Sequence, residues 1–257
     1  MWILRAWVLG ALALVPRLAD AGCTPIAMGE PRVMRAAAAP DALTVTFLGH
    51  ASFLIESPAG VRAVTDYNGY NVPAEPPDIA TMNHAHSTHY TDRPDPRIPH
   101  VLRGWSTDGK PPMIDLQVND MHVGNLPTNI RDWQGGTAVY GNSIFIFESA
   151  GLCVAHLSHL HHLLTEQDLA LLGHIDVVMA PVDGVYTMGQ QDVAAVLDQL
   201  RPKLVLPMHY FMRDVVARFV DLVKDRYAVR FAESSTLVIS RATLPDKPTI
   251  VVLPGGF

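Results

Sequence analysis

Three histidines lie close together in one short stretch of this chain, Asn83-His84-Ala85-His86-Ser87-Thr88-His89-Tyr90, which directly follows an apolar run. If that run is a strand that passes into a loop, His84 and His86 face one side, and a turn can bring His89 toward them. Neutral imidazole is a good zinc ligand, and several ligands on one loop lower the entropy cost of completing a site. The alternative is a solvated loop that happens to contain histidines. A metal site is favoured because seven of the twelve histidines fall in this stretch and in residues 156–162.

A second group of histidines, His156-Leu157-Ser158-His159-Leu160-His161-His162, follows another apolar run, and His209 follows a third. Consecutive side chains diverge, so the flanking members of the second group cannot all bind one metal. Among them we select His162 as an auxiliary ligand or proton donor. His50 is interpreted as a packed histidine with structural hydrogen bonds rather than as a catalytic residue.

The composition indicates a chain that can bury a large core and has little charge for binding polyanions. It has 257 residues, of which 49% are hydrophobic and 17% are charged, and the formal net charge is −6. One domain or two tightly packed halves are expected. Because there is no Lys/Arg-rich run, a nucleic-acid partner is disfavoured and a small-molecule substrate fits better. The oligomeric state is left open.

The first residues, 1–21, have the pattern of a signal peptide. The segment 6–15 is apolar, and Ala19-Asp20-Ala21 offers small residues at the positions that a signal peptidase inspects. The apolar segment is too short to span a bilayer comfortably, so we expect a periplasmic or secreted protein without stable membrane insertion after cleavage at Ala21. A lipoprotein beginning at Cys23 is less favoured because an acidic residue stands where an aliphatic one is expected. A wrongly assigned start or an N-terminal anchor helix would also account for the pattern.

The chain has two cysteines, Cys23 and Cys153. Export would permit a disulfide, but Cys23 begins the mature chain and Cys153 lies inside an apolar strand, so we do not expect the bond. A four-cysteine zinc site is excluded by count. Cys153 has apolar neighbours on both sides and is expected to be buried and unreactive.

The elements expected to position these residues are strands, with helices between the later ones. After an Ala- and Pro-rich leader at 22–41, apolar patterns predict strands at 43–48, 52–56, 61–66, 78–82, 100–103, 114–118, 121–123, 144–147, 152–155, 177–180, 204–206, 235–240 and 249–253. Helices are expected at 165–173, capped by Thr165 with Asp168, at 187–200, capped by Thr187 with Gln190, and at about 213–224. The histidines therefore stand at strand ends in a layered α+β or α/β enzyme.

The order and spacing of several motifs resemble the metallo-β-lactamase fold superfamily, and within it the branch of ascorbate-6-phosphate lactonase and related metal-dependent hydrolases. The matching segments are Leu48-Gly49-His50-Ala51-Ser52-Phe53-Leu54-Ile55, Thr65-Asp66, His84-x-His86-x-Thr88-His89, Asn142 with the strand after it, Asp176-Val177-Val178 with Pro181-Val182, and Pro207-Met208-His209-Tyr210. The resemblance covers about residues 43–211. It implies an α+β fold, an αβ/βα sandwich of two mixed β-sheets with helices on the outer faces and a metal site at one edge. We assign this domain to residues 42–257.

Two replacements set the chain apart from the superfamily pattern. Relatives read His-x-His-x-Asp-His where this chain has Thr88, and His159 stands where relatives have an Asp that bridges two metals. The histidine expected near 128–132 is also missing. Loss of carboxylates favours one metal over two, because two dications would repel each other with less compensation. The expected cofactor is zinc, one or two ions, with manganese or iron as alternatives. The positions that still match or substitute chemically are the expected metal ligands, namely His84, His86, His89, His159 and His209.

The resemblance implies a metal-dependent hydrolase. A metal with three protein ligands keeps a position for water, whose pKa on zinc is about 7, so hydroxide could attack an ester, lactone or phosphoester. Asp66 is expected either to fix the tautomer of a ligand histidine, as part of the catalytic site, or to form a turn. Asp183 is interpreted as a surface turn residue, with the alternative that it restores negative charge at the site from the loop after a buried strand. The alternative function is a catalytically reduced metal-binding protein of the same fold, since both superfamily aspartates are replaced.

Overall fold

The computed structural model describes residue 23, residues 41–132 and residues 134–255. The expected signal peptide lies outside these residues, as does most of the expected leader. No helix in the described part of the chain is long and apolar enough to cross a membrane.

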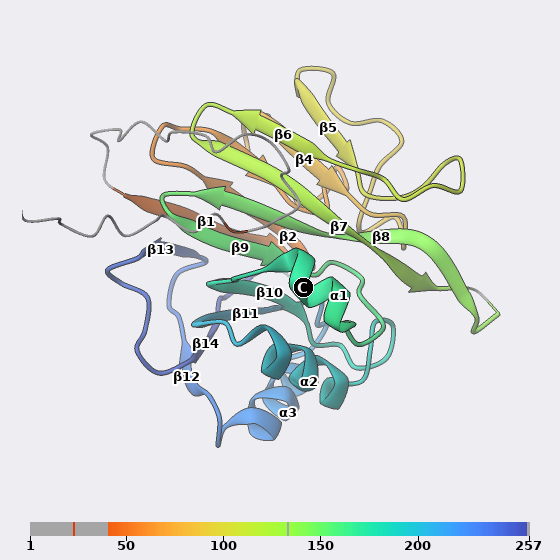
Figure 1. Cartoon of the computed structure of the whole chain (residues 1–257). Coiled ribbons are helices and arrows are strands. Elements are labelled where there is room, and N and C mark those ends of the chain that lie inside the picture. The colour runs from red at the N-terminus through yellow and green to blue at the C-terminus, as the bar shows by residue number, and fades with distance from the viewer. Residues whose placement is uncertain (1–22, 24–40, 133, 256–257) are drawn as a thin grey trace, which may run out of the picture.

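Two β-sheets pack face to face (Figure 1). The first has six strands in the order β13-β1-β2-β3-β4-β5. These are β1 (Ala42–Gly49), β2 (Ser52–Glu56), β3 (Arg62–Val64), β4 (Ile79–Met82), β5 (His100–Arg103) and β13 (Thr236–Ser240). Burial alternates along β1, where Leu43, Val45 and Phe47 face the core between the sheets. Because β3, β4 and β5 are parallel, their carboxyl ends meet at one edge.

The second sheet has eight strands in the order β12-β14-β11-β10-β9-β8-β7-β6. These are β6 (Asp115–Val118), β7 (Met121–Arg131), β8 (Thr137–Ser149), β9 (Leu152–His156), β10 (Val177–Pro181), β11 (Leu204–Met208), β12 (Ala228–Phe231) and β14 (Thr249–Val252). β9, β10 and β11 are parallel and buried at every position, as is typical of strands covered on both faces. β7 and β8 are longer than expected and form a long hairpin.

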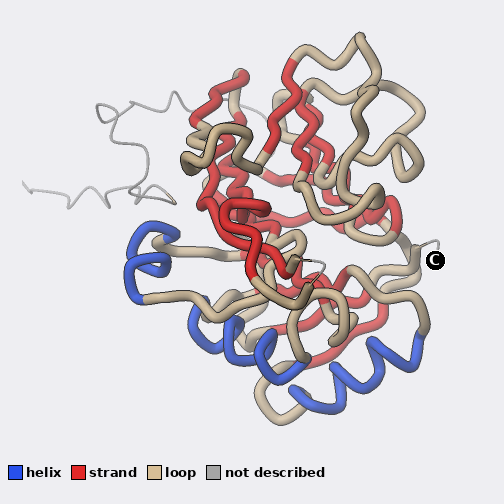
Figure 2. Tube along the Cα trace, turned by 90° about the vertical axis from the view of Figure 1, so that its right-hand side faces the viewer, coloured by secondary structure: helices blue, strands red, loops and turns tan. Residues whose placement is uncertain are grey.

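Three helices in the described residues lie along the outer face of the second sheet (Figures 1 and 2). They are α1 (Glu166–Leu172), α2 (Gln190–Leu200) and α3 (Arg213–Val223). The expected α+β sandwich is confirmed, but no described helix covers the first sheet, whose outer apolar residues pack with side chains from loops. The capping box of Thr165 and Asp168 is present. The expected capping box at Thr187 is wrong: α2 begins after Gly189 without a side-chain cap, and the Thr187 hydroxyl donates to Asp183 instead.

A disulfide joins Cys23 to Cys153, contrary to our expectation. Both cysteines are buried in the core cluster on the helical side of the second sheet, as expected for Cys153, and their Cα atoms are 5.4 Å apart. The two residues are 130 positions apart in the chain. Local sequence patterns do not show that so distant a segment returns to β9, which is why the expectation failed.

Candidate metal centre

Five histidines meet at the edge of the sandwich where strands of both sheets end. His86 and His89 follow β4, and His159 follows β9. His209 follows β11, and His50 lies in the turn between β1 and β2. The backbone N–H of His209 donates to the carbonyl of His50 at 2.7 Å, which joins the two sheets at this point.

The imidazole rings form two close pairs. Nε2 of His86 lies 3.0 Å from Nε2 of His159, and Nε2 of His89 lies 3.1 Å from Nε2 of His209. The ring of His50 lies 4.2 Å from that of His209, centroid to centroid, and its buried Nε2 has no hydrogen-bond partner among the described residues. Nitrogens that bind one zinc ion at about 2.0–2.1 Å lie about 3.0–3.4 Å apart, so both pairs have the spacing of ligands that share an ion.

Burial favours the neutral form of four of these imidazoles, those of His50, His86, His89 and His159. It lowers the pKa of His159 to about 2 and the pKa of His50 to about 3, and neighbouring histidines add to the effect. Burial, followed by the proximity of His209, also lowers the pKa values of His86 and His89. Neutral imidazole is the form that binds metals, so the donor set fits a transition metal such as zinc.

Asp66 contacts His89 on the side of the ring away from the cluster. Its Oδ2 lies 2.6 Å from Nδ1 of His89, and neither side chain is exposed. The Ser158 hydroxyl lies 2.9 and 2.7 Å from the two carboxylate oxygens, and Asn83 donates to Oδ1 at 3.3 Å. Burial raises the pKa of Asp66 to about 6, so the carboxylate is ionised near neutral pH. It therefore holds the proton of His89 on Nδ1 and leaves the Nε2 lone pair toward the cluster.

Asp183 has the corresponding position beside His209. Its Oδ1 lies 3.1 Å from Nδ1 of His209, and its Oδ2 accepts backbone N–H groups of residues 185–187. Burial alone would raise the pKa of Asp183, but the contacts with His209 and the Thr187 hydroxyl hold it well below its usual range. Our interpretation of Asp183 as a surface turn residue is wrong. Asp183 is only 6% exposed, because its loop folds back on His209.

Four residues of this region adopt the left-handed backbone conformation although none is glycine. The φ angles are 52° at His50, 43° at Asp66, 48° at Ser158 and 57° at His209. Such conformations cost about 1–3 kcal/mol each and collect at functional sites, where the surrounding structure enforces them. The sharp turns that follow the strands therefore aim these side chains at the cluster.

The fold agrees with comparisons to known proteins. A family described as "Beta-lactamase superfamily domain" matches residues 44–209. The chain belongs to this family. It is 26% identical over 189 residues to a UPF0173 metal-dependent hydrolase of Pyrococcus furiosus, covering 65% of this chain and 84% of that protein. It also resembles a solved structure from Thermotoga maritima, a proposed zinc-dependent hydrolase of the metallo-β-lactamase superfamily, with a TM-score of 0.62 and 26% identity over 83% of this chain and 100% of that one.

A proposed metal-dependent hydrolase of Parabacteroides distasonis has the same fold, with a TM-score of 0.57 and 20% identity. The match covers 71% of this chain and 89% of that protein. At this identity the likeness concerns the fold alone. The family match over residues 44–209 is what places the histidine cluster on a β-lactamase superfamily scaffold, and a fold says nothing of the chemistry of its site.

In this superfamily protein one expected ligand lies apart from the others. His84 is exposed, and its ring packs against Tyr90 and Trp105 with centroid distances of 4.9 and 5.2 Å. Within the described residues, no ring contact or hydrogen bond joins it to the five clustered histidines. Alternation along a strand does not extend into the following turn, so His84 and His86 point in different directions. The structure thus brings together four of the five expected ligands, His86, His89, His159 and His209.

His162 also lies apart from the cluster. Its Nε2 accepts the backbone N–H of Asn129 at 3.3 Å, and its Nδ1 donates to the carbonyl of Leu163 at 2.9 Å. Both ring nitrogens therefore have partners in the local loops. A role for His162 as proton donor stays a prediction to which these contacts add no support.

Sequence reasoning did not assign His50 or Ser158 to the site, and it placed a site role for Asp183 second to a surface turn. The ring of His50 lies 5.3 Å from that of His89 and 4.2 Å from that of His209. Asp183 follows a buried strand that is adjacent to the strand preceding His209, a signal that could have placed it at the same edge. Ser158 is adjacent to His159, but its hydroxyl contact with Asp66 depends on the turn conformation alone.

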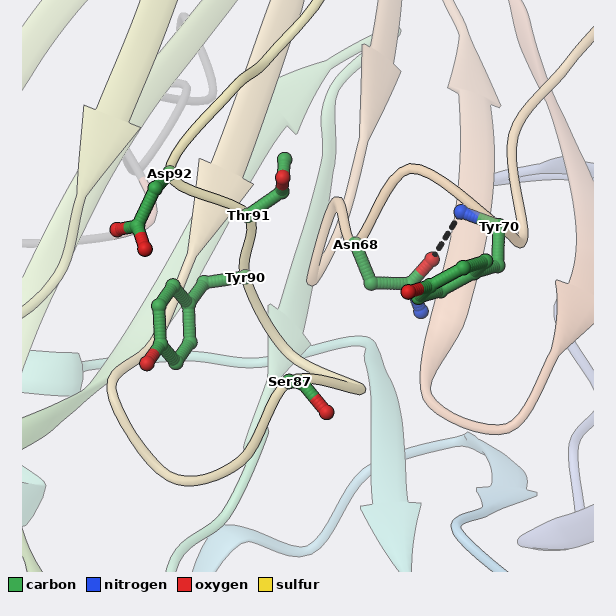
Figure 3. Close-up of a pocket in the computed structure, with 6 residues that line it drawn as sticks. All are labelled: Asn68, Tyr70, Ser87, Tyr90, Thr91 and Asp92. Atoms are coloured by element: carbon green, nitrogen blue, oxygen red, sulfur yellow. Dashed lines mark hydrogen bonds between the residues drawn. The ribbon is translucent and has the colours of Figure 1, made fainter.

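A polar hollow of about 180 Å³ lies beside the loop that carries His86 and His89 (Figure 3). Asn68 connects the hollow to this loop. Its Oδ1 accepts a hydrogen bond from the backbone N–H of Tyr70, and its Nδ2 donates to the carbonyl of Thr88 at 2.8 Å. No lysine or arginine lines the hollow. The lining residues are Asn68, Tyr70, Ser87, Tyr90, Thr91 and Asp92.

Proposed function

We propose that this chain is a metal-dependent hydrolase whose metal is held by His86, His89, His159 and His209, with His50 beside them. The observation that carries the proposal is the presence of two Nε2 pairs, 3.0 and 3.1 Å apart, together with the group of His50, His89 and His209, whose ligand nitrogens all lie within 4.8 Å of one another. Relatives named metal-dependent hydrolases support the reaction class. The finer assignment to the ascorbate-6-phosphate lactonase branch rests on motif resemblance alone.

The protein groups around the ion would prepare it for hydrolysis. A bound divalent ion supplies a Lewis acid and lowers the pKa of water, which provides a nucleophile near neutral pH for attack on an ester, lactone or phosphoester. Asp66 and Asp183 orient His89 and His209 by holding them at Nδ1. His50 is neutral near pH 7, and its partnerless Nε2 can accept a proton from the reacting group.

We propose one ion rather than two, zinc first, with manganese or iron as alternatives. The centre consists of imidazole nitrogens, and both nearby carboxylates, Asp66 and Asp183, contact the Nδ1 side of a histidine. Neither therefore replaces the bridging carboxylate whose position His159 occupies. The same observation favours the second candidate function, a metal-binding protein of this fold with little or no hydrolase activity.

We propose that the domain spans residues 42–257 and that the protein is exported after cleavage of residues 1–21. The disulfide between Cys23 and Cys153 supports this, because disulfides persist in oxidising compartments. A disulfide also occupies the thiol of Cys23, which a lipoprotein would need for its lipid. A periplasmic or secreted soluble form is thus favoured over a lipoprotein.

The test is to purify the mature chain, quantify zinc, manganese and iron per chain, and assay an ester, a lactone and a phosphodiester before and after chelation. We expect about one ion per chain and hydrolysis that is lost with the metal and restored by it. His159→Ala should lose both, whereas His174→Ala, whose side chain is 59% exposed, should lose neither. Activity that survives rigorous metal removal would refute the hydrolase proposal. A metal-loaded but inert protein would favour the second candidate.

A further inference from the structure

Exposed apolar side chains border the histidine cluster. Tyr186 is 55% exposed and Phe211 is 49% exposed, in the loops after β10 and β11. Their sequence neighbours Val185 and Met212 are 70% and 62% exposed. Single apolar residues are common on protein surfaces, but a group of large ones from two adjoining loops marks a binding surface. We call these four residues the apolar rim.

The two aromatic rings of the rim contact each other and the histidines. The centroid of Tyr186 lies 5.9 Å from that of Phe211 and 6.1 Å from that of His86. Phe211 lies 5.3 Å from His50 and 5.9 Å from His209. A molecule whose reacting group lies at the histidines therefore has these rings beside it.

The loop that carries Tyr186 is held in place by the site itself. Oδ2 of Asp183 accepts the backbone N–H groups of Val185, Tyr186 and Thr187, and its Oδ1 contacts His209 at 3.1 Å. Val185 and Tyr186 are thus fixed relative to the cluster, which lowers the entropy cost of binding a ligand against this half of the rim.

Apart from the proposed metal ion, no lysine or arginine side chain among the described residues makes a hydrogen bond, ion pair or ring contact with the five histidines, Tyr186 or Phe211 that would attract an anionic ligand. The carboxylates that contact these histidines among the described residues are those of Asp66 and Asp183. Arg213, the first residue of α3, is the lysine or arginine nearest to Phe211 along the chain. Because its charge could attract an anion, the test includes an anionic substrate.

We propose that Tyr186 and Phe211 form a specificity surface for a neutral carboxylic ester with an apolar acyl chain, which lies against the two rings while its carbonyl lies at the histidines. This inference rests on the proposed hydrolase function and names its substrate class. In the reaction, a water oxygen bonds to the acyl carbon and the ester C–O bond breaks. One water proton goes to the leaving alcohol, and the other is released as the carboxylic acid ionises. Each methylene that the rings cover should strengthen binding about fourfold.

The test measures kcat and KM of the metal-loaded enzyme on para-nitrophenyl acetate, butyrate and octanoate, with bis(para-nitrophenyl) phosphate as the anionic substrate. We expect kcat/KM to rise at least about tenfold from acetate to octanoate, mainly through KM. The rise should disappear in the variant with Tyr186→Ser and Phe211→Ser. It should persist with the conservative pair Tyr186→Phe and Phe211→Tyr. The matched control is Phe231→Ser, since Phe231 is a 63% exposed aromatic residue on β12, two strands from β11.

A binding measurement supports the kinetics independently of turnover. Calorimetry with octanamide and acetamide, neutral analogues that resist hydrolysis, should show that the longer acyl chain binds more tightly to the wild type and that the serine pair removes this difference. Failure of the wild type to hydrolyse any ester would refute the hydrolase function itself. Hydrolysis without dependence on chain length, or faster hydrolysis of the phosphodiester, would overturn the substrate class alone. A wild-type dimer that the serine pair converts to a monomer would show that the rim is a subunit interface and would also overturn it.

Discussion

Oδ2 of Asp66 lies 2.6 Å from Nδ1 of His89, and neither side chain has any exposed surface. The contact joins the segment after β3 to the loop after β4, while the Ser158 hydroxyl approaches the same carboxylate from the second sheet. A carboxylate is stable in such a place only when hydrogen-bond donors satisfy its oxygens. Asp66 therefore connects the two sheets and sets the orientation of one candidate ligand.

Replacing Asp66 by asparagine should weaken metal binding about 10- to 100-fold, because the uncharged amide no longer stabilises the orienting proton on His89. Asparagine has the same shape and tolerates the φ of 43° at this position, so the backbone should be retained. Competition with a chromogenic chelator measures the affinity. Asp221→Asn, at a side chain that is 74% exposed, is the matched control. An unchanged affinity in Asp66→Asn would show that the contact is only structural.

His159→Ala should lower metal content, whereas His84→Ala should leave it unchanged. Nε2 of His159 lies 3.0 Å from Nε2 of His86, whereas the exposed ring of His84 packs against Tyr90 and Trp105. Metal per chain measured by mass spectrometry checks both variants. Loss of metal in His84→Ala would mean that the loop rearranges when the ion binds. Full metal content in His159→Ala would exclude His159 as a ligand.

Restoring carboxylates with Thr88→Asp and His159→Asp together should raise the metal count toward two. Thr88 lies in the loop between His86 and His89, and its carbonyl is fixed by Asn68. Two negative charges would compensate the repulsion between two dications, which imidazoles cannot do. The measurement is metal stoichiometry at saturating zinc, with each single variant alongside. A count that does not change would show that the backbone here no longer permits a second ion.

The sequence was sufficient for the strands and for most of the cluster, because apolar patterns locate strands and parallel strands place their ends together. His159 and His209 follow buried strands that lie close together as β9 and β11, separated only by β10. Their approach to His89 follows from that topology, which the family resemblance supplied.

Features that depend on side-chain direction in turns could not be predicted in this way. His84 turns outward and His50 turns inward, and neither orientation follows from a period of two. Thr187 matched a capping box, but the buried carboxylate of Asp183 is the partner of its hydroxyl. In that case a tertiary contact replaced the local hydrogen bond that the capping-box pattern predicts.

The metal-free protein should lose stability as the pH falls from about 7 to about 5. Burial lowers the pKa values of His50, His86, His89 and His159, so the unfolded chain binds protons below about pH 6.5 that the folded chain does not. Asp66, whose pKa rises from 3.8 to about 6, and His122, whose pKa is also raised, act in the opposite sense. However, the lowered pKa values of His156 and His161 bring the opposing histidines to six.

Thermal unfolding in the presence of chelator measures this dependence. His159→Ala should make the fall of Tm with pH shallower, while the exposed His174→Ala should leave it as in the wild type. A Tm that is the same at both ends of this pH range would contradict the neutral state of the buried imidazoles.

Removing the disulfide with Cys23→Ser and Cys153→Ala should lower the free energy of unfolding by about 2–4 kcal/mol, because the bond restricts the unfolded chain between residues that are 130 positions apart. Denaturant unfolding of the variant and of the oxidised wild type gives the difference. Intact mass of the exported protein provides the second measurement: it should be lower than that of the reduced chain by two hydrogens and should carry no lipid. An N-terminal peptide that begins at Cys23 with a diacylglycerol group would contradict the disulfide and establish that the protein is a lipoprotein.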